Sequence, residues 1–327
     1  MITDIRQNLL SWYKIAQRDL PWRRTRDPYA IWISEVMLQQ TRVMAVIPYY
    51  HRFLERFPNI EALAAASEPD LLACWSGLGY YSRARNLQKA ARQMNATFPA
   101  DYESIRALAG VGDYTSAAVA SIAFGLPHAV LDGNVIRVLS RLSNEMGDVG
   151  KLSTRRRLQC LAEDLLDRKL PGIFNQAVME LGATICLPKQ PQCLICPIAE
   201  WCEARKTGTQ NLLPVKLRKG KPVKLERTLL VIQRNGKLLM WRRPDDAKKL
   251  GGFWELPEPH LLNFSQTGVH LGEFRHSITN HNYVFYVKIA TVGKKPDGFA
   301  WVSREDSQKL PFSTTSRKAL AIFSSKS

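Results

Sequence analysis

The spacing of apolar residues changes once along this chain, from a helical period to a strand period. Up to about Arg205 apolar residues recur every three or four positions, as in the stripes Leu87, Ala90, Ala91, Met94 and Leu158, Leu161, Leu165, Leu166. After a lysine-rich stretch, period two begins over 228–233, 237–242 and 283–289, with an Arg-Asn-Gly hairpin signal between the first two runs. We therefore predict a multidomain fold: an all-α region over 1–206, a basic linker over 207–224 and a small α+β domain over 225–327.

The charge balance points to a polyanionic partner. The 327 residues include 46 Lys and Arg against 29 Asp and Glu, a net charge of +17, and such an excess is typical of nucleic-acid-binding proteins. With 45% hydrophobic residues, wholesale disorder is excluded. No apolar run approaches the roughly 20 residues of a membrane span, and the N-terminus does not have the pattern of a signal peptide. We expect a cytoplasmic protein without a signal or transmembrane segment.

Four of the six cysteines lie close together, at Cys186, Cys193, Cys196 and Cys202. Four thiolates in one short loop suit a [4Fe–4S] cube or a tetrahedral zinc, and the spacing alone leaves the metal open. Unpaired structural thiols are the alternative, but free cysteines are usually scattered. Cys74 and Cys160 stand alone in helical patterns, and we expect both in the core.

A glycine-rich turn joins two helical patterns at Leu108–Thr115. The Gly-Val-Gly sequence has no side chain beyond Val111, so backbone amides at the following helix N-terminus can approach a phosphate closely. A helical hairpin also needs a tight turn for purely structural reasons, so Gly110 and Gly112 alone do not establish a binding site.

Two carboxylates stand in unlike surroundings. Glu35 interrupts an apolar helical stretch, where burial would raise its pKa and let it donate a proton near neutral pH; an exposed helix position is the alternative. Asp132 precedes an amphipathic helix, where an ordinary N-cap is the alternative. We expect the helix N-terminus to keep Asp132 ionised. Such a pair suits cleavage of a glycosidic bond, with one acid for the leaving group and one anion beside the sugar cation.

These segments together resemble one family. The stretches SEVMLQQT, GLGYYSRARNL, LAGVGDYTSA and VLDGNVIRVLSR, with the cysteine spacing, are similar to the MutY adenine DNA glycosylases of the endonuclease III, helix-hairpin-helix superfamily. The resemblance implies a hairpin over about 105–125 and a structural [4Fe–4S] cluster on the loop 186–202. It also implies hydrolysis of the bond to an adenine opposite 8-oxoguanine or guanine in double-stranded DNA, by a nucleoid-associated monomer.

The same resemblance assigns roles to single residues. Glu35 protonates adenine N7, Asp132 stabilises the sugar cation and Asn134 orients Asp132. Tyr114 stands where the superfamily's lyases carry the lysine that forms a Schiff base, which implies a monofunctional hydrolase with Tyr114 bonded near Glu35 or Asp132.

The target base must leave the duplex to reach these groups. The resemblance makes Gln40 and Tyr80 the wedge residues, Trp22, Arg23 and Gln176 the adenine pocket, and Gly110 and Gly112 part of the DNA contact. Each assignment has a plain alternative: a polar helix end at Gln40, a core aromatic pair at Tyr80, and a solvated basic face around Arg23.

The C-terminal part carries the segment GGFWELP, which resembles the MutT-like (Nudix) domain of the same family. No two consecutive glutamates follow the linker, so the metal-binding motif of Nudix hydrolases is missing from the sequence. The resemblance implies that this domain recognises 8-oxoguanine through a loop whose residues here are Ile278, Thr279, Asn280 and His281. Thr279 keeps a hydroxyl that can bond the purine's Hoogsteen edge; a turn with no ligand is the alternative.

Three competing functions make different predictions. An endonuclease III-like lyase would nick DNA and form an adduct that borohydride traps. A damage-binding protein without catalysis would bind without releasing a base. A Nudix hydrolase would cleave triphosphates with magnesium.

Overall fold

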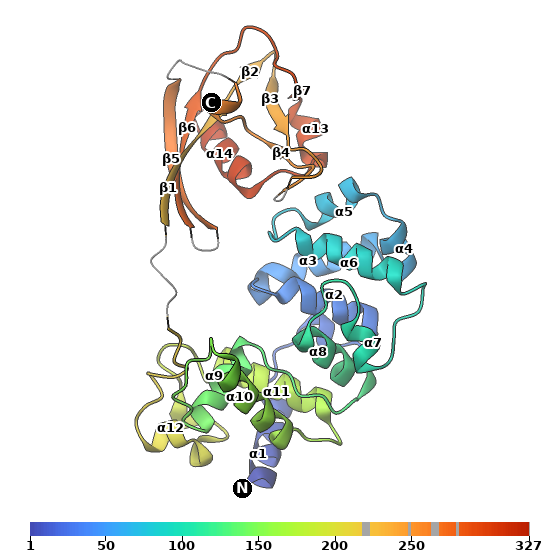
Figure 1. The fold of residues 1–327 in the computed structure, drawn as a ribbon, viewed down its shortest axis with the longest axis vertical. Coiled ribbons are helices and arrows are strands. Elements are labelled where there is room, and N and C mark those ends of the chain that lie inside the picture. The colour runs from blue at the N-terminus through green and yellow to red at the C-terminus, as the bar shows by residue number, and fades with distance from the viewer. Residues whose placement is uncertain (218–222, 248–249, 263–267, 279–280, 327) are drawn as a thin grey trace. The chain divides into compact units, whose positions relative to one another are not determined.

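The computed structural model describes residues 1–217, 223–247, 250–262, 268–278 and 281–326. The chain divides into two compact units, one of Met1–Ala65 with Arg85–Arg218 and one of Ala66–Ala84 with Lys219–Ser327 (Figure 1). None of the helices that the structure describes is long and apolar enough to span a membrane.

The first unit is helical, as predicted. Its elements are α1 Ile2–Ala16, η1 Pro21–Arg23, α2 Pro28–Leu38, α3 Val43–Arg56, α4 Ile60–Ala65, most of α6 Ser82–Gln93, α7 Tyr102–Arg106, α8 Asp113–Phe124, α9 Gly133–Leu142, α10 Leu152–Leu165, α11 Pro171–Thr184, η2 Cys193–Ile195, η3 Ala199–Trp201 and α12 Glu203–Lys206.

Capping residues explain where the helices of the active-site region begin. Asp27 accepts hydrogen bonds from the amides of Tyr29 and Ala30 at the start of α2, and Pro28 occupies the first helical position. Asp132 accepts from the amide of Val135 at the start of α9. Because α2 is apolar on all sides, most of its residues are buried, Glu35 among them.

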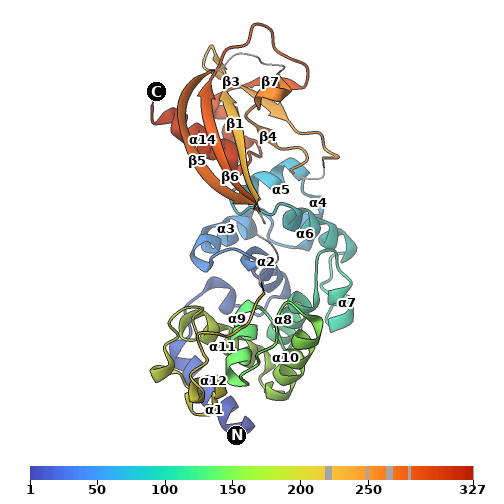
Figure 2. The same cartoon turned by 60° about the vertical axis from the view of Figure 1, so that its left-hand side comes forward.

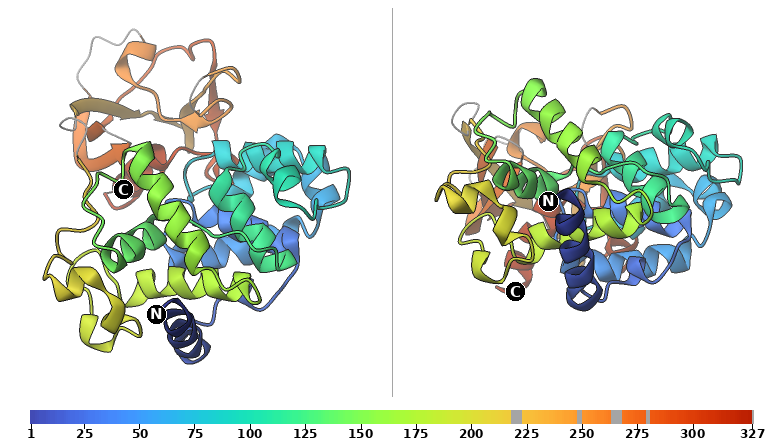
Figure 3. Two further views of the ribbon diagram at one scale, coloured as in Figure 1. Left: turned by 60° about the horizontal axis from the view of Figure 1, so that its bottom comes forward. Right: turned by 90° about the horizontal axis from the view of Figure 1, so that it is seen from below.

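The core of the first unit lies between α1, α8, α9, α10 and α11. Helix α11 packs against α1, α8 and α9 (Figure 3). Representative buried side chains are Leu9, Ala118, Leu139, Leu158 and Leu181.

The two cysteines outside the cluster, Cys74 and Cys160, differ in burial. Cys74 is buried as expected, but Cys160 is exposed, so the prediction for Cys160 is wrong. On helix α10, the side chains of Leu158 and Ala162 are buried and face the core. Cys160 follows Leu158 by two positions, which is about 200° around the helix, and therefore faces away from it.

The start of the predicted linker packs on the first unit. Leu213 is buried, and its carbonyl accepts a 3.2 Å hydrogen bond from Arg141 Nε. The amide of Val149 donates to the carbonyl of Val215 at 2.9 Å. The backbone carbonyls of Leu213 and Val215 thus hold this stretch on the first unit, one through the Arg141 side chain and one through a backbone amide.

The second unit contains α5 Glu68–Trp75 and the C-terminal α+β elements. These are β1 Val223–Val231, β2 Gln233–Arg234, β3 Lys237–Arg242, β4 Trp254–Glu255, η4 Pro259–Leu261, β5 Val269–Ile278, β6 His281–Ile289, β7 Phe299–Val302, α13 Arg304–Lys309 and α14 Thr314–Ser324.

Two sheets form the C-terminal part, as Figure 2 shows. In one, β6 pairs in parallel with β1 and antiparallel with β5; in the other, β3 pairs antiparallel with β2, β4 and β7. Helix α14 packs on β1 and β5, and Val231, Met240, Phe285 and Ala319 are buried in one shared core. The α+β prediction is confirmed, including the hairpin turn, where Asn235 and Gly236 have φ of 51° and 73°.

Candidate active site

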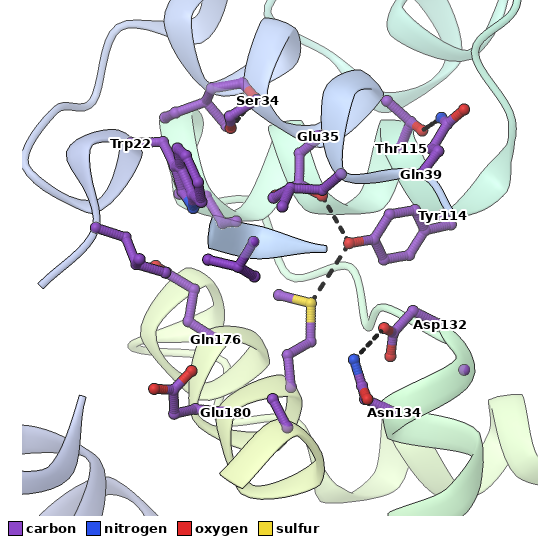
Figure 4. A pocket seen from close by; sticks show the side chains of 18 of the residues that line it. Trp22, Ser34, Glu35, Gln39, Tyr114, Thr115, Asp132, Asn134, Gln176 and Glu180 are labelled. Carbon is purple, nitrogen blue, oxygen red and sulfur yellow. Dashed lines mark hydrogen bonds between the residues drawn. The ribbon is translucent and has the colours of Figure 1, made fainter. Parts of the chain in front are cut away.

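A pocket of about 580 Å³ opens within the first unit. Residues of η1, α2, the turn before α8, the start of α9 and one face of α11 line this pocket. The lining includes all the residues to which the sequence assigned catalysis or adenine binding: Trp22, Arg23, Glu35, Tyr114, Asp132, Asn134 and Gln176. It also includes two of the predicted DNA-contact residues, Gln40 and Gly112. Figure 4 shows Glu35, Tyr114 and Asp132 projecting into this space from different elements.

Glu35 is a buried acid with a high pKa. Its residue exposure is 5%, and Tyr114 Oη donates a 2.6 Å hydrogen bond to its Oε2 (Figure 4). Burial, together with the negative charge of Asp132, raises the pKa of Glu35 to about 7, although the Tyr114 hydrogen bond and Arg23 oppose the rise. A large fraction of Glu35 therefore carries a proton near neutral pH, as the sequence led us to expect.

Asp132 is held by its neighbours on α9. Its Oδ1 accepts from the amide of Val135 at 2.7 Å, and its Oδ2 accepts from Asn134 Nδ2 at 2.9 Å. Burial raises the pKa of Asp132 above its usual value, and the hydrogen bonds from Val135 and Asn134 only partly offset this. The amide of Val135 at the helix N-terminus does favour the ionised carboxylate, but burial of this helix end, which the sequence does not show, has the larger effect on the pKa of Asp132.

Tyr114 bridges two helices. Besides Glu35 on α2, its hydroxyl contacts Met179 Sδ on α11 at 3.4 Å. Burial raises the pKa of Tyr114 well above its usual range, so the phenol stays neutral and acts as a donor. Among the described residues that line the pocket there is no lysine.

The pocket also contains an acid that was not predicted from the sequence, Glu180. Its side chain is fully buried and accepts from Arg18 Nη2 and Arg23 Nη2, each at 2.7 Å. Burial alone would raise the pKa of Glu180, but the hydrogen bonds from Arg18 and Arg23 lower it to about 2. The available signal was the one that singled out Glu35, an acid inside an apolar helical run.

Tyr13, on α1, contacts two of the residues that line the pocket. Gln176 lies one helical turn before Glu180 on α11, and its Oε1 accepts a 3.4 Å hydrogen bond from Tyr13 Oη. The Arg23 guanidinium lies 5.5 Å from the centre of the Tyr13 ring. Tyr13 thus supports both the Gln176 amide and the Arg23 cation.

The two predicted wedge residues share an unusual backbone. Gln40 and Tyr80 have φ of 56° and 49°, a region that residues other than glycine seldom adopt. Gln40 is exposed at the end of α2 and lines the pocket. Tyr80 belongs to the second unit and is 48% exposed, whereas its neighbour Tyr81 is buried.

The glycine turn joins α7 to α8. Gly110 has φ +74°, and a Cβ there would come within 2.6 Å of the Asn86 side chain, so the position demands glycine. Gly112 caps α8 in an extended conformation. Arg106 and Asp113 form an ion pair across the turn.

The four clustered cysteines line one cavity after α11. Arg141 Nη1 lies 3.2 Å from Cys186 Sγ, and Cys202 Sγ donates to the Arg141 carbonyl at 3.4 Å. Burial raises the pKa of the Cys196 thiol to about 12, and the other three thiols add to the rise. Within the described part of the chain, no three Cys, His, Asp or Glu side chains are arranged to hold a single metal ion.

Arg137 connects this cysteine loop to Asn134, the hydrogen-bond partner of Asp132. Its Nε donates to the Cys186 carbonyl at 2.7 Å, and its Nη2 donates to Asn134 Oδ1 at 2.9 Å and to the Gly182 carbonyl at 2.6 Å. Asn134 in turn donates to Asp132.

Two of the predicted lesion residues are described, both in the second unit. Ile278 ends β5 and His281 begins β6; the His281 ring centre is 6.1 Å from that of Tyr283. Thr279 and Asn280 lie outside the described residues, as does the Ile278 side chain.

Known DNA-repair proteins are similar to this chain in sequence. Residues 33–163 match the model of the HhH-GPD superfamily of base excision DNA repair proteins. The chain is 34% identical to the human adenine DNA glycosylase over 98% of this chain and 74% of that protein. It is 36% identical to the adenine DNA glycosylase of Buchnera aphidicola subsp. Schizaphis graminum over 75% of this chain and 71% of that protein.

Solved structures resemble the helical part. A thermostable thymine-DNA glycosylase has a TM-score of 0.57 at 29% identity and covers 63% of this chain and 97% of its own. An endonuclease III–DNA complex has a TM-score of 0.54 at 25% identity, covering 64% and 99%. Since the human alignment spans almost the whole sequence, the chain belongs to the adenine DNA glycosylases, enzymes of base excision repair in the HhH-GPD superfamily.

Proposed function

We propose that this chain hydrolyses the N-glycosidic bond of an adenine mispaired with 8-oxoguanine or guanine, and that it leaves the DNA strand intact. The observation that carries the proposal is the pairing of a protonated Glu35 with Tyr114 in a pocket that also contains Asp132. The functional regions are those of the sequence analysis: a catalytic region over 1–206, a linker over 207–224 and a lesion-recognition domain over 225–327.

Glu35 acts as the general acid. With a pKa of about 7, a large fraction of Glu35 is protonated near neutral pH. The protonated form can transfer its proton to N7 of the flipped adenine, which converts the base into a neutral leaving group. After departure of the base, the Glu35 carboxylate is placed to accept a proton from the attacking water.

Asp132 stabilises the positive charge that develops on the sugar. Its two hydrogen bonds, from Val135 and Asn134, hold the carboxylate in one orientation. Although burial raises its pKa, a cationic sugar beside it favours the anion, so its negative charge is used in the transition state.

Tyr114 supports a monofunctional reaction. A phenol cannot form the Schiff base on which strand cleavage by β-elimination depends. The lysine-free lining of the described pocket offers no substitute amine from a lysine side chain. The abasic product therefore keeps its backbone.

The residues of the polar wall of the pocket select adenine. Trp22 supplies an aromatic face, and Arg23 and Gln176 supply hydrogen-bonding groups at the rim of the base. Glu180, whose two oxygens accept hydrogen bonds from Arg18 and Arg23, holds the Arg23 guanidinium in place at this wall.

DNA binding combines several elements. The α7–α8 turn with Gly110 and Gly112 offers backbone amides to a phosphate. The left-handed backbones of Gln40 and Tyr80 support their assignment as wedges that fill the gap left by the flipped base. The +17 charge predicts affinity that falls steeply with salt.

The four cysteines fit a [4Fe–4S] cube. A zinc ion with Zn–S bonds of about 2.3 Å draws its sulfurs to within about 4 Å of one another; the described thiols line one cavity without forming a single-ion site. A cube has four separate irons and spaces its thiolates more widely. By the family resemblance, the bound cluster supplies structure to a DNA-contacting loop.

Recognition of 8-oxoguanine is assigned to the segment 276–281 of the MutT-like domain, with the hydroxyl of Thr279 as the group that can bond the base and Ile278, Asn280 and His281 as the other candidate residues. The sequence, in which no two consecutive glutamates follow the linker, argues against triphosphate hydrolysis by this domain.

The test is adenine release by the full-length chain, assembled with its cluster, from duplexes with A opposite 8-oxoguanine, G, C or T. We expect free adenine from the first two and an intact strand until alkali is added. Nicking before alkali, with an adduct trapped by borohydride, would instead establish a lyase.

A further inference from the structure

The backbone that leads into Asp132 is held by side chains. Residues between the end of α8 and Asp132 form no regular secondary structure, yet Ala129 and Val130 are buried. Buried backbone amides and carbonyls need partners, and here side chains from two helices provide them.

Asn175 of α11 is the centre of this arrangement. Its Oδ1 accepts from the amide of Val130 at 3.2 Å. Its Nδ2 donates to the carbonyl of His128 at 2.8 Å and to Ser121 Oγ at 2.9 Å. The side chain is 3% exposed, so one amide ties the segment on both sides of Ala129.

Helix α10 completes the set. Glu163 Oε1 accepts from the amide of Ala129 at 3.2 Å, and Gln159 Nε2 donates to the carbonyl of Ala129 at 3.2 Å. Gln159 and Glu163 are also bonded to each other at 2.9 Å. The backbone polar groups from the His128 carbonyl to the Val130 amide are thus all paired with side chains.

We propose that Asn175 is a positioning residue for adenine excision, because it fixes the backbone of residues 128–130 and thereby the place of Asp132 in the pocket. Only Leu131 separates Val130 from Asp132, so a shift of the held segment moves the carboxylate. The inference rests on the role of Asp132 in the proposed function.

Helix α11 then serves both parts of the reaction. Asn175 holds the segment that carries Asp132, while the next residue, Gln176, and Glu180 line the base pocket. The close packing of α11 on α8 supports this: a Cβ on Gly172 would come within 2.5 Å of the Ser121 carbonyl. One rigid helix therefore sets the distance between the base-binding wall and the sugar-stabilising carboxylate.

The variant Asn175→Leu removes all three hydrogen bonds with little change of volume. We expect the single-turnover rate of adenine release to fall about 10- to 100-fold, since displacement of a catalytic group by about 1 Å has an effect of this size. Affinity for a duplex carrying an uncleavable 2′-fluoro-deoxyadenosine opposite 8-oxoguanine should stay unchanged, because the base-binding wall is intact.

Two readouts separate positioning from general destabilisation. The charged or titratable groups that act on Glu35 are Tyr114, Asp132 and Arg23. Since the Asp132 charge raises the pKa of Glu35, displacement of Asp132 should move the alkaline limb of the rate–pH profile to lower pH. Hydrogen exchange should show the amide of Val130, which is bonded to Asn175, protected in the wild type and unprotected in Asn175→Leu.

The control is Leu63→Ala, which opens the core at α4, away from this segment. Rates are compared well below both melting temperatures. We expect Leu63→Ala to keep the wild-type alkaline limb and the protection of the Val130 amide. A wild-type rate, pH profile and exchange pattern in Asn175→Leu would overturn the inference.

Asp132→Asn keeps the two proposals apart. If this variant retains the wild-type rate, the assigned role of Asp132 in the proposed function fails. If it is inactive while Asn175→Leu behaves as the wild type, only the positioning role of Asn175 fails.

Discussion

The hydroxyl of Tyr114 donates a 2.6 Å hydrogen bond to Glu35 Oε2, and this contact works against the burial that raises the pKa of Glu35. A hydrogen bond to the charged form of an acid lowers its pKa. Tyr114 therefore holds the proton affinity of Glu35 below the value that burial alone would produce.

The variant Tyr114→Phe tests this relationship. Loss of the hydrogen bond raises the pKa of Glu35, so the alkaline limb of the rate–pH profile should move to higher pH. The maximal rate should fall by about tenfold, since the acid loses its orienting partner. Single-turnover rates measured across pH 5–9 (a range of about four units around the pKa) supply the profile, and a limb that moves to lower pH would contradict the assignment.

Glu35→Gln should separate stability from activity. Above pH 7 the wild type carries a buried charge at Glu35, whose pKa is about 7 when folded against an ordinary 4.5. The raised pKa means that the native state loses stability as pH rises from 4.5 through 7, by about 3 kcal/mol at 1.36 kcal/mol per pH unit.

We therefore expect Glu35→Gln to be more stable than the wild type at pH 8 and nearly equal to it at acidic pH, as measured by urea unfolding. Its adenine release should fall by about 10²- to 10⁴-fold, the usual range for loss of a general acid. Unchanged turnover would refute Glu35 as the acid.

Glu180→Ala should destabilise the first unit by about 3 kcal/mol, because it leaves Arg23 buried without its anion. Glu203→Gln is the matched control, since Glu203 pairs with Lys206 at an exposed position and should change stability by less than about 1 kcal/mol.

The pH dependence follows from the lowered pKa of Glu180. The pair contributes its full stabilisation above pH 4.5 and loses it as pH falls through about 2. The difference between wild type and Glu180→Ala should therefore persist at pH 5 and shrink only in strong acid. A difference that disappears near pH 5 would contradict the geometry.

Gly182→Ala tests the support of Asn134. A Cβ at this position would come 2.7 Å from Asn134 Cβ, so Asn134 must move and Asp132 loses a hydrogen-bond donor. We expect about a tenfold lower excision rate and a loss of about 1–3 kcal/mol in stability. Thr184→Ala, on the same helix but bonded only to the carbonyl of Glu180, should keep the wild-type rate.

The cysteine loop predicts the metal content of the purified protein. We expect about four iron atoms and inorganic sulfide per chain, as a [4Fe–4S] cube requires. Cys196→Ser should lower both together with DNA affinity. One zinc and no sulfide would exclude the cube.

Much of the fold and several of the site residues could be predicted from patterns of neighbouring residues in the sequence. The helical period identified the first unit, and the Asn235-Gly236 pair identified a hairpin because positive φ at two successive residues favours these types. Glu35 could be predicted as a site residue because burial of an ionised carboxyl group is unfavourable in free energy, so acids are rare in apolar helical stretches. Cys160 was misplaced because helical spacing in sequence does not say which face of α10 meets the core.

By itself, the sequence determined the succession of helices and strands, the acid in an apolar helix and the group of cysteines, since all of these are properties of neighbouring residues. The tertiary structure decided the hydrogen-bond partners of the site residues. It placed Tyr114 beside Glu35, and Arg18 and Arg23 around Glu180. It also placed Asn175 against the segment that leads to Asp132. It also decided the direction of the pKa shift at Asp132. Burial and contacts between distant segments set these quantities, because the free energy of a charge depends on everything packed around it.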